Sequence, residues 1–281
     1  MNNTVLTSAH ITAYTRYLIA EEKAAATIEK YLQDIQAFIL WMNGKEVTKE
    51  AAIQWKSYLV ESGRTPATVN TKLSAINGLF RYLGWNDCQV KFLKVQKRVF
   101  RDMSRELTRE EYKRLLNTAD SLNMEWLALL METICSTGIR VSEVKYITIE
   151  ALTTGRADIY LKGKIRTILL PSKLSRKLKK YAQKKRIVSG EIYRTENGKS
   201  LSRHQIWKAM KMLCSKADVE PSKVFPHNLR HLFAATFYHM TRDIVKLADL
   251  LGHSSVETTR IYLLTTGVEH VRQLERLGLV S

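Results

Sequence analysis

Two stretches near the C-terminal end decide how this chain is organised: Phe225-Pro-His-Asn-Leu-Arg-His231 and Leu250-Leu-Gly-His-Ser-Ser-Val-Glu-Thr-Thr-Arg-Ile-Tyr262. In the first, Pro226 suits the opening position of a helix, because its missing N–H would have no partner there. His227 and Arg230 then lie three residues apart and share one helix face. This stretch therefore predicts a helix whose first turns present an imidazole and a guanidinium side by side.

The second stretch predicts a loop between two short helices. Gly252 suits the left-handed cap that ends a helix. Ser254 is expected to cap the next helix, with Glu257 completing a capping box. Tyr262 then lies about two turns into that helix, after a loop that presents His253. Two imidazoles, a guanidinium and a phenol that converge on one point suit a phosphate group better than a hydrophobic core.

The composition favours a nucleic-acid partner. The chain has 281 residues, enough for one large or two ordinary domains, and a formal net charge of +18, from 45 Lys and Arg against 27 Asp and Glu. Nucleic acid is the default partner for such an excess. A membrane surface is the weaker alternative, because no segment reaches the roughly 18 apolar residues of a membrane span.

Cysteine usage and the first residues indicate an intracellular protein. Cys88, Cys135 and Cys214 are far apart and form no CxxC pair. We therefore expect buried thiols rather than disulfides or zinc ligands. The residues from Met1 onward show no basic and apolar regions of a signal peptide.

Residues 1–90 predict a bundle of short helices with an aromatic core. Apolar spacing and caps place helices at about 8–22, from Thr27 to Gly44, from Thr48 to Gly63 and from Thr65 to Gly84. The polar face of the last helix suits a DNA groove, with Asn and Arg reading bases; an ordinary solvated face is the alternative. That face carries Thr68, Asn70, Lys72, Asn77 and Arg81, of which Lys72 and Arg81 are our candidates for DNA contact.

A basic segment at about 91–105 predicts a linker between two domains, 1–101 and 102–281. Its first eleven residues carry no acid, and its basic residues are Lys91, Lys94, Lys97, Arg98, Arg101 and Arg105. We expect Lys97 and Arg98 to lie against phosphates. A solvated tether is a compatible alternative.

The second half begins with a capping box at Thr108 and Glu111, followed by a buried helix over 123–137. Gly138 breaks that helix, and Arg140 follows before the next one. Such an arginine is held in place by its surroundings, either for a structural task, bonding helix-end carbonyls, or for a functional one.

Further along, 157–162 and 164–171 alternate and predict a two-stranded hairpin with Gly163 in the turn. Lysines at a loop tip are usually only solvated. Residues 173–186 hold eight basic residues and no acid. We interpret this run either as a solvated helix face or as a phosphate contact. Ser202 is expected to cap a helix, and 268–277 predicts a terminal amphipathic helix.

These side chains suit attack on a phosphodiester by Tyr262. Arg140 and Arg230 would clamp the non-bridging oxygens with paired hydrogen bonds. A phenol has an ordinary pKa of about 10, so it needs a proton acceptor or cationic neighbours. The leaving 5′ oxygen needs a proton donor, which a hairpin lysine would supply. No acidic cluster is placed to hold a metal, so the arginines would take its place.

The chain resembles the tyrosine recombinases, or phage integrase family, over nearly its whole length. The matching pieces are Thr137-Gly-Ile-Arg-Val-Ser-Glu143, Lys162-Gly-Lys-Ile-Arg-Thr167, Pro226-His-Asn-Leu-Arg-His231, Leu250-Leu-Gly-His-Ser254 and Thr258-Thr-Arg-Ile-Tyr262. The resemblance implies a mainly α fold: a helical, SAM-like core-binding domain, then an α-rich catalytic domain with a small β-hairpin.

The resemblance also implies a mechanism. Arg140, His227, Arg230 and His253 would hold the scissile phosphate, and Tyr262 would attack it, leaving a 3′-phosphotyrosine and a free 5′ hydroxyl. Strand exchange would pass through a Holliday junction, for integration, excision or resolution, without cofactor or metal.

The implied partner is double-stranded DNA at a specific target site. Four protomers would act on two sites, with the last helix docking on a neighbour and an accessory protein or second recombinase possible. The implied location is cytoplasmic and nucleoid-associated, in a bacterial or phage-encoded protein, with no membrane.

The hairpin departs from the family pattern. Members often carry Gly-Lys-Gly-x-Lys, with the first lysine as the acid, whereas the turn here is shorter. We favour Lys162 over Lys164 as the acid, and expect Lys164 and Arg166 to contact DNA. Nothing before residue 8 matches an arm-binding domain, so the chain resembles the simple Xer and Cre type.

Two other functions share parts of this pattern: a DNA-binding protein that keeps the fold without activity, and a type IB topoisomerase. Retention of Tyr262 with both arginines favours the enzyme, and the motifs favour a recombinase. The other histidines, His10, His204, His239 and His270, lack a matching context, and His231 is expected only to neighbour the site or lie on the helix face.

Overall fold

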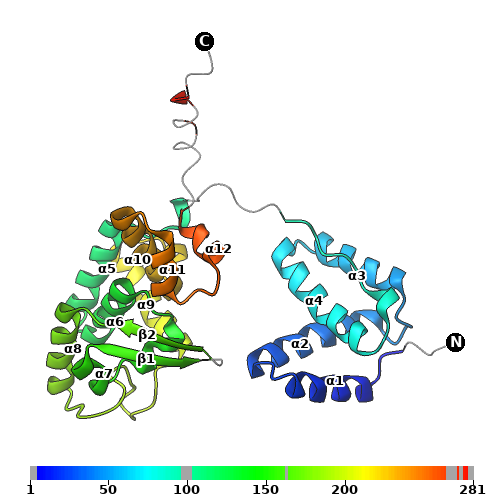
Figure 1. Ribbon diagram of the computed structural model, residues 1–281, viewed down its shortest axis with the longest axis horizontal. Helices are drawn as coiled ribbons and strands as arrows, with labels where there is room; N and C mark the ends of the chain where they lie inside the picture. Colours follow the sequence, from blue (N-terminus) through cyan, green and yellow to red (C-terminus); the bar gives the residue numbers. More distant parts are fainter. Residues whose placement is uncertain (1–4, 96–102, 162–163, 264–270, 272–274, 278–281) are drawn as a thin grey trace. The chain divides into compact units, whose positions relative to one another are not determined.

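The computed structural model describes residues 5–95, 103–161, 164–263, 271 and 275–277. The chain divides into two compact units, Met1–Lys97 and Arg98–Ser281 (Figure 1). The predicted boundary after residue 101, the candidates Lys97 and Arg98, and most of the predicted terminal helix lie outside the described residues.

The N-terminal unit is a helical bundle. Its elements are α1 (Ser8–Ala20), α2 (Ala25–Met42), α3 (Lys49–Glu61), α4 (Pro66–Tyr82) and the 3-10 turn η1 (Asn86–Cys88). Thr48 and Thr65 cap α3 and α4 through their side chains, as predicted. The predicted cap at Thr27 is wrong, because α2 already begins at Ala25 and has no side-chain cap. Phe38, Trp55 and Phe80 are buried, which confirms the aromatic core.

Two asparagines of α4 hold the chain that follows the bundle. Asn77 donates to the carbonyl of Val90 (2.8 Å) and accepts from its N–H (3.0 Å), and Asn70 pairs in the same way with Leu93 (2.9 and 2.8 Å). Each asparagine side chain thus satisfies both the N–H and the C=O of one residue, as the backbone of a neighbouring strand would. Both asparagines are therefore occupied by backbone and do not present their amides to DNA bases, and the first residues of the predicted linker are anchored to this unit.

Lys72 is likewise engaged inside the bundle. Its Nζ lies 2.9 Å from Oδ1 of the buried Asp34, which also accepts from Lys30 at 2.7 Å. Lys72 keeps only 17% of its side chain exposed, so it compensates a buried carboxylate rather than standing free for a phosphate. Arg81, in the last turn of α4, is exposed.

The second unit is a set of helices packed with one hairpin (Figure 1). Its elements are η2 (Met103–Arg105), α5 (Arg109–Ser121), α6 (Glu125–Thr137), η3 (Val141–Tyr146), α7 (Ile149–Thr154), β1 (Arg156–Leu161), β2 (Lys164–Leu169), α8 (Ser172–Lys184), α9 (Arg203–Ala217), η4 (Pro221–Lys223), α10 (Pro226–Thr241), α11 (Ile244–Leu251), α12 (Val256–Thr259) and η5 (Arg260–Leu263). The predicted capping box at Thr108 and the cap at Ser202 are both formed.

The predicted hairpin is confirmed as an antiparallel pair in which Leu161 lies opposite Lys164. Ala157, Ile159 and Ile168 face inward and are buried. Alternate residues such as Tyr160 and Ile165 are exposed, as expected for a sheet with one solvated face. No helix among the described residues is long and apolar enough to cross a membrane.

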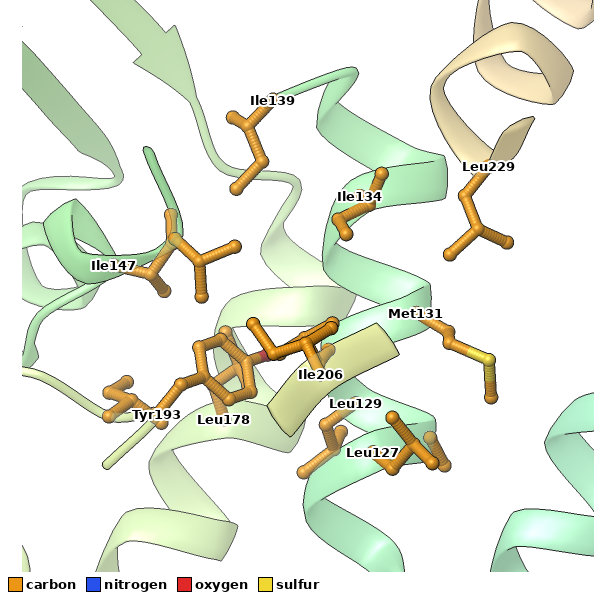
Figure 2. Packing of buried hydrophobic residues seen from close by; sticks show 14 of the residues in the cluster. Leu127, Leu129, Met131, Ile134, Ile139, Ile147, Leu178, Tyr193, Ile206 and Leu229 are labelled. Carbon is orange, nitrogen blue, oxygen red and sulfur yellow. The ribbon is translucent and has the colours of Figure 1, made fainter. Parts of the chain in front are cut away.

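Helix α6 forms the centre of this unit. It carries a nearly continuous run of buried side chains from Leu127 to Ile134, as its apolar sequence predicts. Figure 2 shows Met131 and Ile134 between Leu229 of α10 and residues from the other side of the core. Its C-terminal end at Thr137 is thereby fixed in position. The three cysteines are free thiols, with Cys88 and Cys214 buried and Cys135 partly buried.

Gly138 ends α6 and admits no side chain. Its φ is +65°, and an added Cβ would lie 2.5 Å from the Phe233 ring and 3.0 Å from a Leu251 methyl. We expect Gly138→Ala to lower the free energy of unfolding by about 1–2 kcal/mol for the left-handed backbone and about 1–3 kcal/mol more for overpacking. Urea denaturation measures both contributions together.

Gly155 provides the matched control. It ends α7 with φ +72°, yet nothing lies within 4 Å of an added Cβ. Gly155→Ala is therefore expected to show the backbone cost alone. An equal loss in the two variants would mean that the packing around Gly138 is not tight.

Candidate active site

The predicted cationic residues meet where four segments converge. Arg140 precedes η3 just after the end of α6, and His227 and Arg230 lie in the first turns of α10. His253 follows the left-handed cap Gly252 at the end of α11, and Tyr262 lies in η5. His253 is 2.9 Å from Arg230, and its ring lies 6.1 Å from that of Tyr262, nearly parallel at 12°. Residues separated by more than a hundred positions therefore share one site.

Arg230 is the buried anchor of the site, with 2% of its surface exposed. Its Nη1 donates to the carbonyl of Gly138, and Nη2 donates to the carbonyl of Leu251 (2.8 Å). These are carbonyls at the ends of α6 and α11, which lack helical partners. The structural task considered for Arg140 is thus performed by Arg230. Arg140, with 39% of its side chain exposed, stays available to an incoming anion.

Glu143 is a buried carboxylate that organises two arginines. It accepts from the backbone N–H of Arg140 (2.7 Å) and from its Nη1 (3.0 Å). Its Oε2 also accepts from Nη2 of Arg166 at 3.0 Å. Glu143 is 1% exposed, so these charge-assisted bonds are what stabilise its charge. The result is a fixed orientation of the Arg140 guanidinium.

Arg166, predicted as a DNA contact, points into this network instead. Besides Glu143, its Nη1 donates to the carbonyl of Leu251, and its side chain is only 14% exposed. Burial lowers the pKa of its guanidinium to about 10. The charge of Glu143 raises this pKa, whereas those of Arg230 and Arg140 lower it further. Gly252 leaves the space that Arg166 occupies, because a Cβ there would lie 2.5 Å from its Cδ. Arg166 therefore links β2 to the His253 loop.

The hydrogen bonds of His253 define its tautomer. Nη2 of Arg230 can only donate a hydrogen bond. In its contact with His253, at 2.9 Å, Nε2 of the imidazole is therefore the acceptor. The ring proton then resides on Nδ1, which donates to Oγ1 of the buried Thr259 at 2.8 Å. Burial, followed by the charges of Arg230 and Arg140, lowers the pKa of His253 to about 4. His253 is therefore neutral at pH 7.

The helix that carries Thr259 begins one residue later than predicted. Ser255, not Ser254, caps α12, and its Oγ accepts from the N–H of Glu257 at 3.2 Å. The capping box predicted at Ser254 is wrong, because Ser255 takes the extended N-cap conformation, with φ −145° and ψ 133°. The shift matters little for the site, since Thr259 still faces His253.

Tyr262 is held among rings. Only 5% of its surface is exposed. His231 packs edge-on against it, with centroids 4.6 Å apart, and His231 in turn contacts His227 at 5.0 Å. The Tyr262 ring also lies beside that of His253, whose Nε2 accepts from Arg230. Burial, followed by Arg140, lowers the pKa of Arg230. The phenol ring thus lies beside the cationic cluster.

His227 completes the cluster on its open side. It keeps an exposed edge, yet partial burial lowers its pKa, with Arg230 and Arg140 adding to the effect. A neutral imidazole beside two guanidinium groups can accept a proton or donate a hydrogen bond. The arrangement as a whole provides a positive, partly enclosed position for an anion next to a phenol.

Two residues of this site had no role predicted from the sequence. Glu143 lies in a quoted motif but was given no role, although its position three residues after Arg140 has capping-box spacing. Thr259 had no signal of its own. His231 was expected to neighbour the site or lie on the helix face, and the first alternative holds, because its ring contacts the phenol ring.

The two hairpin lysines have different outcomes. Lys162 lies outside the described residues. Lys164 is the first residue of β2. The choice between them as proton donor stays a prediction.

Two family models match the chain. The one described as "Phage integrase family" covers residues 105–266, and "Phage integrase, N-terminal SAM-like domain" covers residues 11–87. Among relatives, tyrosine recombinase XerA of Thermococcus kodakarensis is 30% identical over 272 residues, 94% of this chain and 93% of the relative. Tyrosine recombinase XerD of Listeria monocytogenes is 25% identical over 273 residues, 89% and 91% of the two chains.

Solved structures share the fold. The XerH site-specific recombinase bound to difH substrate, in a pre-cleavage complex, superposes with a TM-score of 0.69 at 20% identity, covering 95% of this chain and 84% of that one. A lambda integrase dimer bound to a COC′ core site gives a TM-score of 0.74 at 17% identity, covering 92% and 78%.

Proposed function

The chain belongs to the phage integrase family of site-specific tyrosine recombinases, and from that premise we propose that Tyr262 is its nucleophile. The observation that carries this proposal is the position of Tyr262, whose ring lies 6.1 Å from that of His253, which in turn accepts from the buried Arg230. Attack on a scissile phosphate would form a 3′-phosphotyrosine and release a 5′ hydroxyl. Rejoining after strand exchange, through a Holliday junction, would conserve the bond energy.

The cationic cluster would stabilise the transition state. Negative charge grows on the non-bridging oxygens during attack, and Arg140 and Arg230 would each receive it through hydrogen bonds. Arg230 is fixed by helix-end carbonyls and Arg140 by Glu143. Their donors therefore need little reorganisation when the charge appears, which is the usual source of large electrostatic catalysis.

His253 would change partners when DNA binds. In the free protein its Nε2 accepts from Arg230. A phosphate oxygen accepting from Arg230 would displace that bond and leave Nε2 free to take the phenol proton. His227, on the open side of the cluster, would hold another phosphate oxygen or assist the transfer.

The proposal includes the partners and setting. We propose double-stranded DNA at a specific site as substrate, four protomers acting on two sites, and activity in the cytoplasm with nucleoid association. Solved relatives bound to DNA substrates support the DNA partner. An accessory protein or second recombinase belongs to the same proposal. Among phosphate contacts, Arg81, Lys97 and Arg98 stay candidates.

A nicked suicide substrate tests the proposed chemistry. Target DNA is first selected from a genomic or random library by binding and cleavage. The nick lets the leaving strand diffuse away, so that a covalent protein–DNA adduct accumulates. Peptide mapping is expected to locate the nucleotide on Tyr262. An adduct on another residue, or none on a DNA that is otherwise cut, would sink the assignment.

The general acid can be identified by replacing each lysine alone. Lys162→Ala is expected to slow cleavage by about 10²–10⁴, the usual contribution of a positioned acid. Lys164→Ala is expected to cleave near the normal rate. A substrate with a 5′-bridging sulfur should restore the rate of the defective variant, because a thiolate leaves without a proton. Loss in Lys164→Ala alone would reverse our choice.

Thr259 should matter through the tautomer of His253. Thr259→Val keeps the shape of the side chain but leaves the Nδ1 proton without an acceptor, which costs about 1–3 kcal/mol. The competing tautomer would turn a proton toward Arg230. We expect adduct formation about tenfold slower, and a changed ¹⁵N spectrum of the His253 ring.

Thr259→Ser is the control for that prediction. Serine retains the hydroxyl, so it should preserve the tautomer and most of the rate. If valine and serine behave alike, the hydroxyl of Thr259 does not orient His253.

A further inference from the structure

Helix α8 carries a surface of unusual charge. Its thirteen residues, Ser172–Lys184, include no acid. Leu174, Leu178 and Tyr181 are buried against the core and fix the orientation of the helix. The opposite side exposes four cations, which we call the α8 basic surface: Lys173, Arg176, Lys179 and Lys180.

These four cations are not neutralised by neighbouring acids. The nearby carboxylates Glu132 and Glu125 are engaged with two other lysines of the helix, Lys177 at 2.6 Å and Lys184 at 2.7 Å. Within the part of the chain that the structure describes, no member of the α8 basic surface forms an ion pair. On α8, the charges of Lys177 and Lys184 are thus compensated by carboxylates, whereas those of the α8 basic surface are not.

The spacing of the cations suits a polyphosphate backbone. Positions 173, 176 and 180 differ by three and four, so they form one stripe, with Lys179 beside it. The helix is about 20 Å long, and lysine and arginine stems extend the reach of each charge. A rigid row of this length can meet several successive phosphates, which a single loop lysine cannot.

The α8 basic surface lies away from the nucleophile. In Figure 1, α8 forms one side of the second unit, whereas α12, which leads to Tyr262, and the end of the hairpin at Leu161 lie on the other. Elements this far apart in one projection are at least as far apart in space. DNA is stiff, with a persistence length of about 150 base pairs, so a duplex held at Tyr262 cannot also curve around to α8.

We propose that the α8 basic surface is a second duplex-binding surface, which holds a DNA segment other than the one at the catalytic site. The inference rests on the proposed function only in taking the Tyr262 side as the first DNA surface. A second duplex is favoured over an acidic protein because binding at the first surface brings flanking and neighbouring DNA close, which raises the effective concentration of the same ligand. The binding would be sequence-independent and salt-sensitive.

A bridging assay tests this second surface without knowledge of the target site. One duplex of about 30 base pairs, well below the persistence length, is immobilised. A labelled duplex of unrelated sequence is added, and retained label is measured against salt. The variant is Lys173→Gln/Arg176→Gln/Lys179→Gln/Lys180→Gln. Its matched control is Lys177→Gln/Lys184→Gln, which removes the two paired cations from the same helix.

The quadruple variant is expected to retain at least about threefold less labelled duplex than the parent. The magnitude of its log–log salt slope should fall by up to about 3.6, at 0.9 for each of four phosphates. The control should bridge as the parent does. Bridging by the catalytic sides of associated protomers persists in every variant, so the difference reports α8 alone.

Two further arms complete the design. Binding to one immobilised short duplex should fall far less than bridging does, because the catalytic side alone can hold that duplex, and circular dichroism should confirm equal folding. A target site is also placed in a duplex of about 30 or about 300 base pairs. This comparison distinguishes binding of flanking DNA from the same duplex from binding of a second, separate duplex. Equal bridging by parent and quadruple variant at all salt concentrations overturns the inference. Absence of a Tyr262 adduct would instead overturn the proposed function and leave the bridging result intact.

Discussion

Tyr262→Phe is expected to bind target DNA as the parent does and to form no covalent adduct. The phenylalanine ring would keep the contacts with His231 and His253, because these involve the ring and not the hydroxyl. Arg230 would keep its three acceptors. Fold and binding should therefore survive, with a stability change of at most about 1.5 kcal/mol for the loss of one hydroxyl, while the nucleophilic oxygen is absent.

The measurement combines a binding titration with denaturing gels of a nicked substrate. Tyr238→Phe is the matched control, since Tyr238 packs in the same apolar cluster but its ring lies against Arg242, outside the predicted site. It should form adduct at the normal rate. Adduct at parental yield in Tyr262→Phe would remove Tyr262 as the nucleophile.

Arg230→Lys is expected to lose both activity and stability. Lysine keeps the charge, but its single nitrogen cannot reach the carbonyls of Gly138 and Leu251 and the ring of His253 together. The Leu251 carbonyl would keep the bond from Arg166, but leaving the buried Gly138 carbonyl unpaired costs about 1–3 kcal/mol. Loss of a placed transition-state donor should slow adduct formation by about 10²–10³.

Arg140→Lys separates the two effects. Arg140 is more exposed, and its partner Glu143 stays within reach of a lysine and of Arg166. We expect a comparable loss of rate with less than about 1 kcal/mol of stability. Urea denaturation and single-turnover adduct formation on the same samples measure both quantities. A destabilisation as large as that of Arg230→Lys would contradict the division into an anchor and an exposed clamp.

Local signals in the sequence were sufficient for most elements of this protein. Caps such as Thr48, Thr65, Thr108 and Ser202 form as predicted, because a cap depends only on residues a few positions apart. The same local logic failed at Thr27 and Ser254, where the observed N-caps are Ala24 and Ser255. The site residues Arg140, His227, Arg230, His253 and Tyr262 were identifiable because their types and spacings follow motifs.

What each residue does was decided by packing across long separations. Arg230, and not Arg140, binds the helix-end carbonyls, which belong to Gly138 and Leu251. No local sequence pattern places these carbonyls beside α10. Lys72 and Arg166 are cationic, as a DNA contact should be, but each forms an ion pair with a buried carboxylate of another element. Lys72 pairs with Asp34, and Arg166 pairs with Glu143. A sequence records that a side chain is cationic, whereas its partner follows from which elements the core brings together. Tyr262 was thus recognisable from its motif, but only the tertiary structure places its ring between those of His231 and His253.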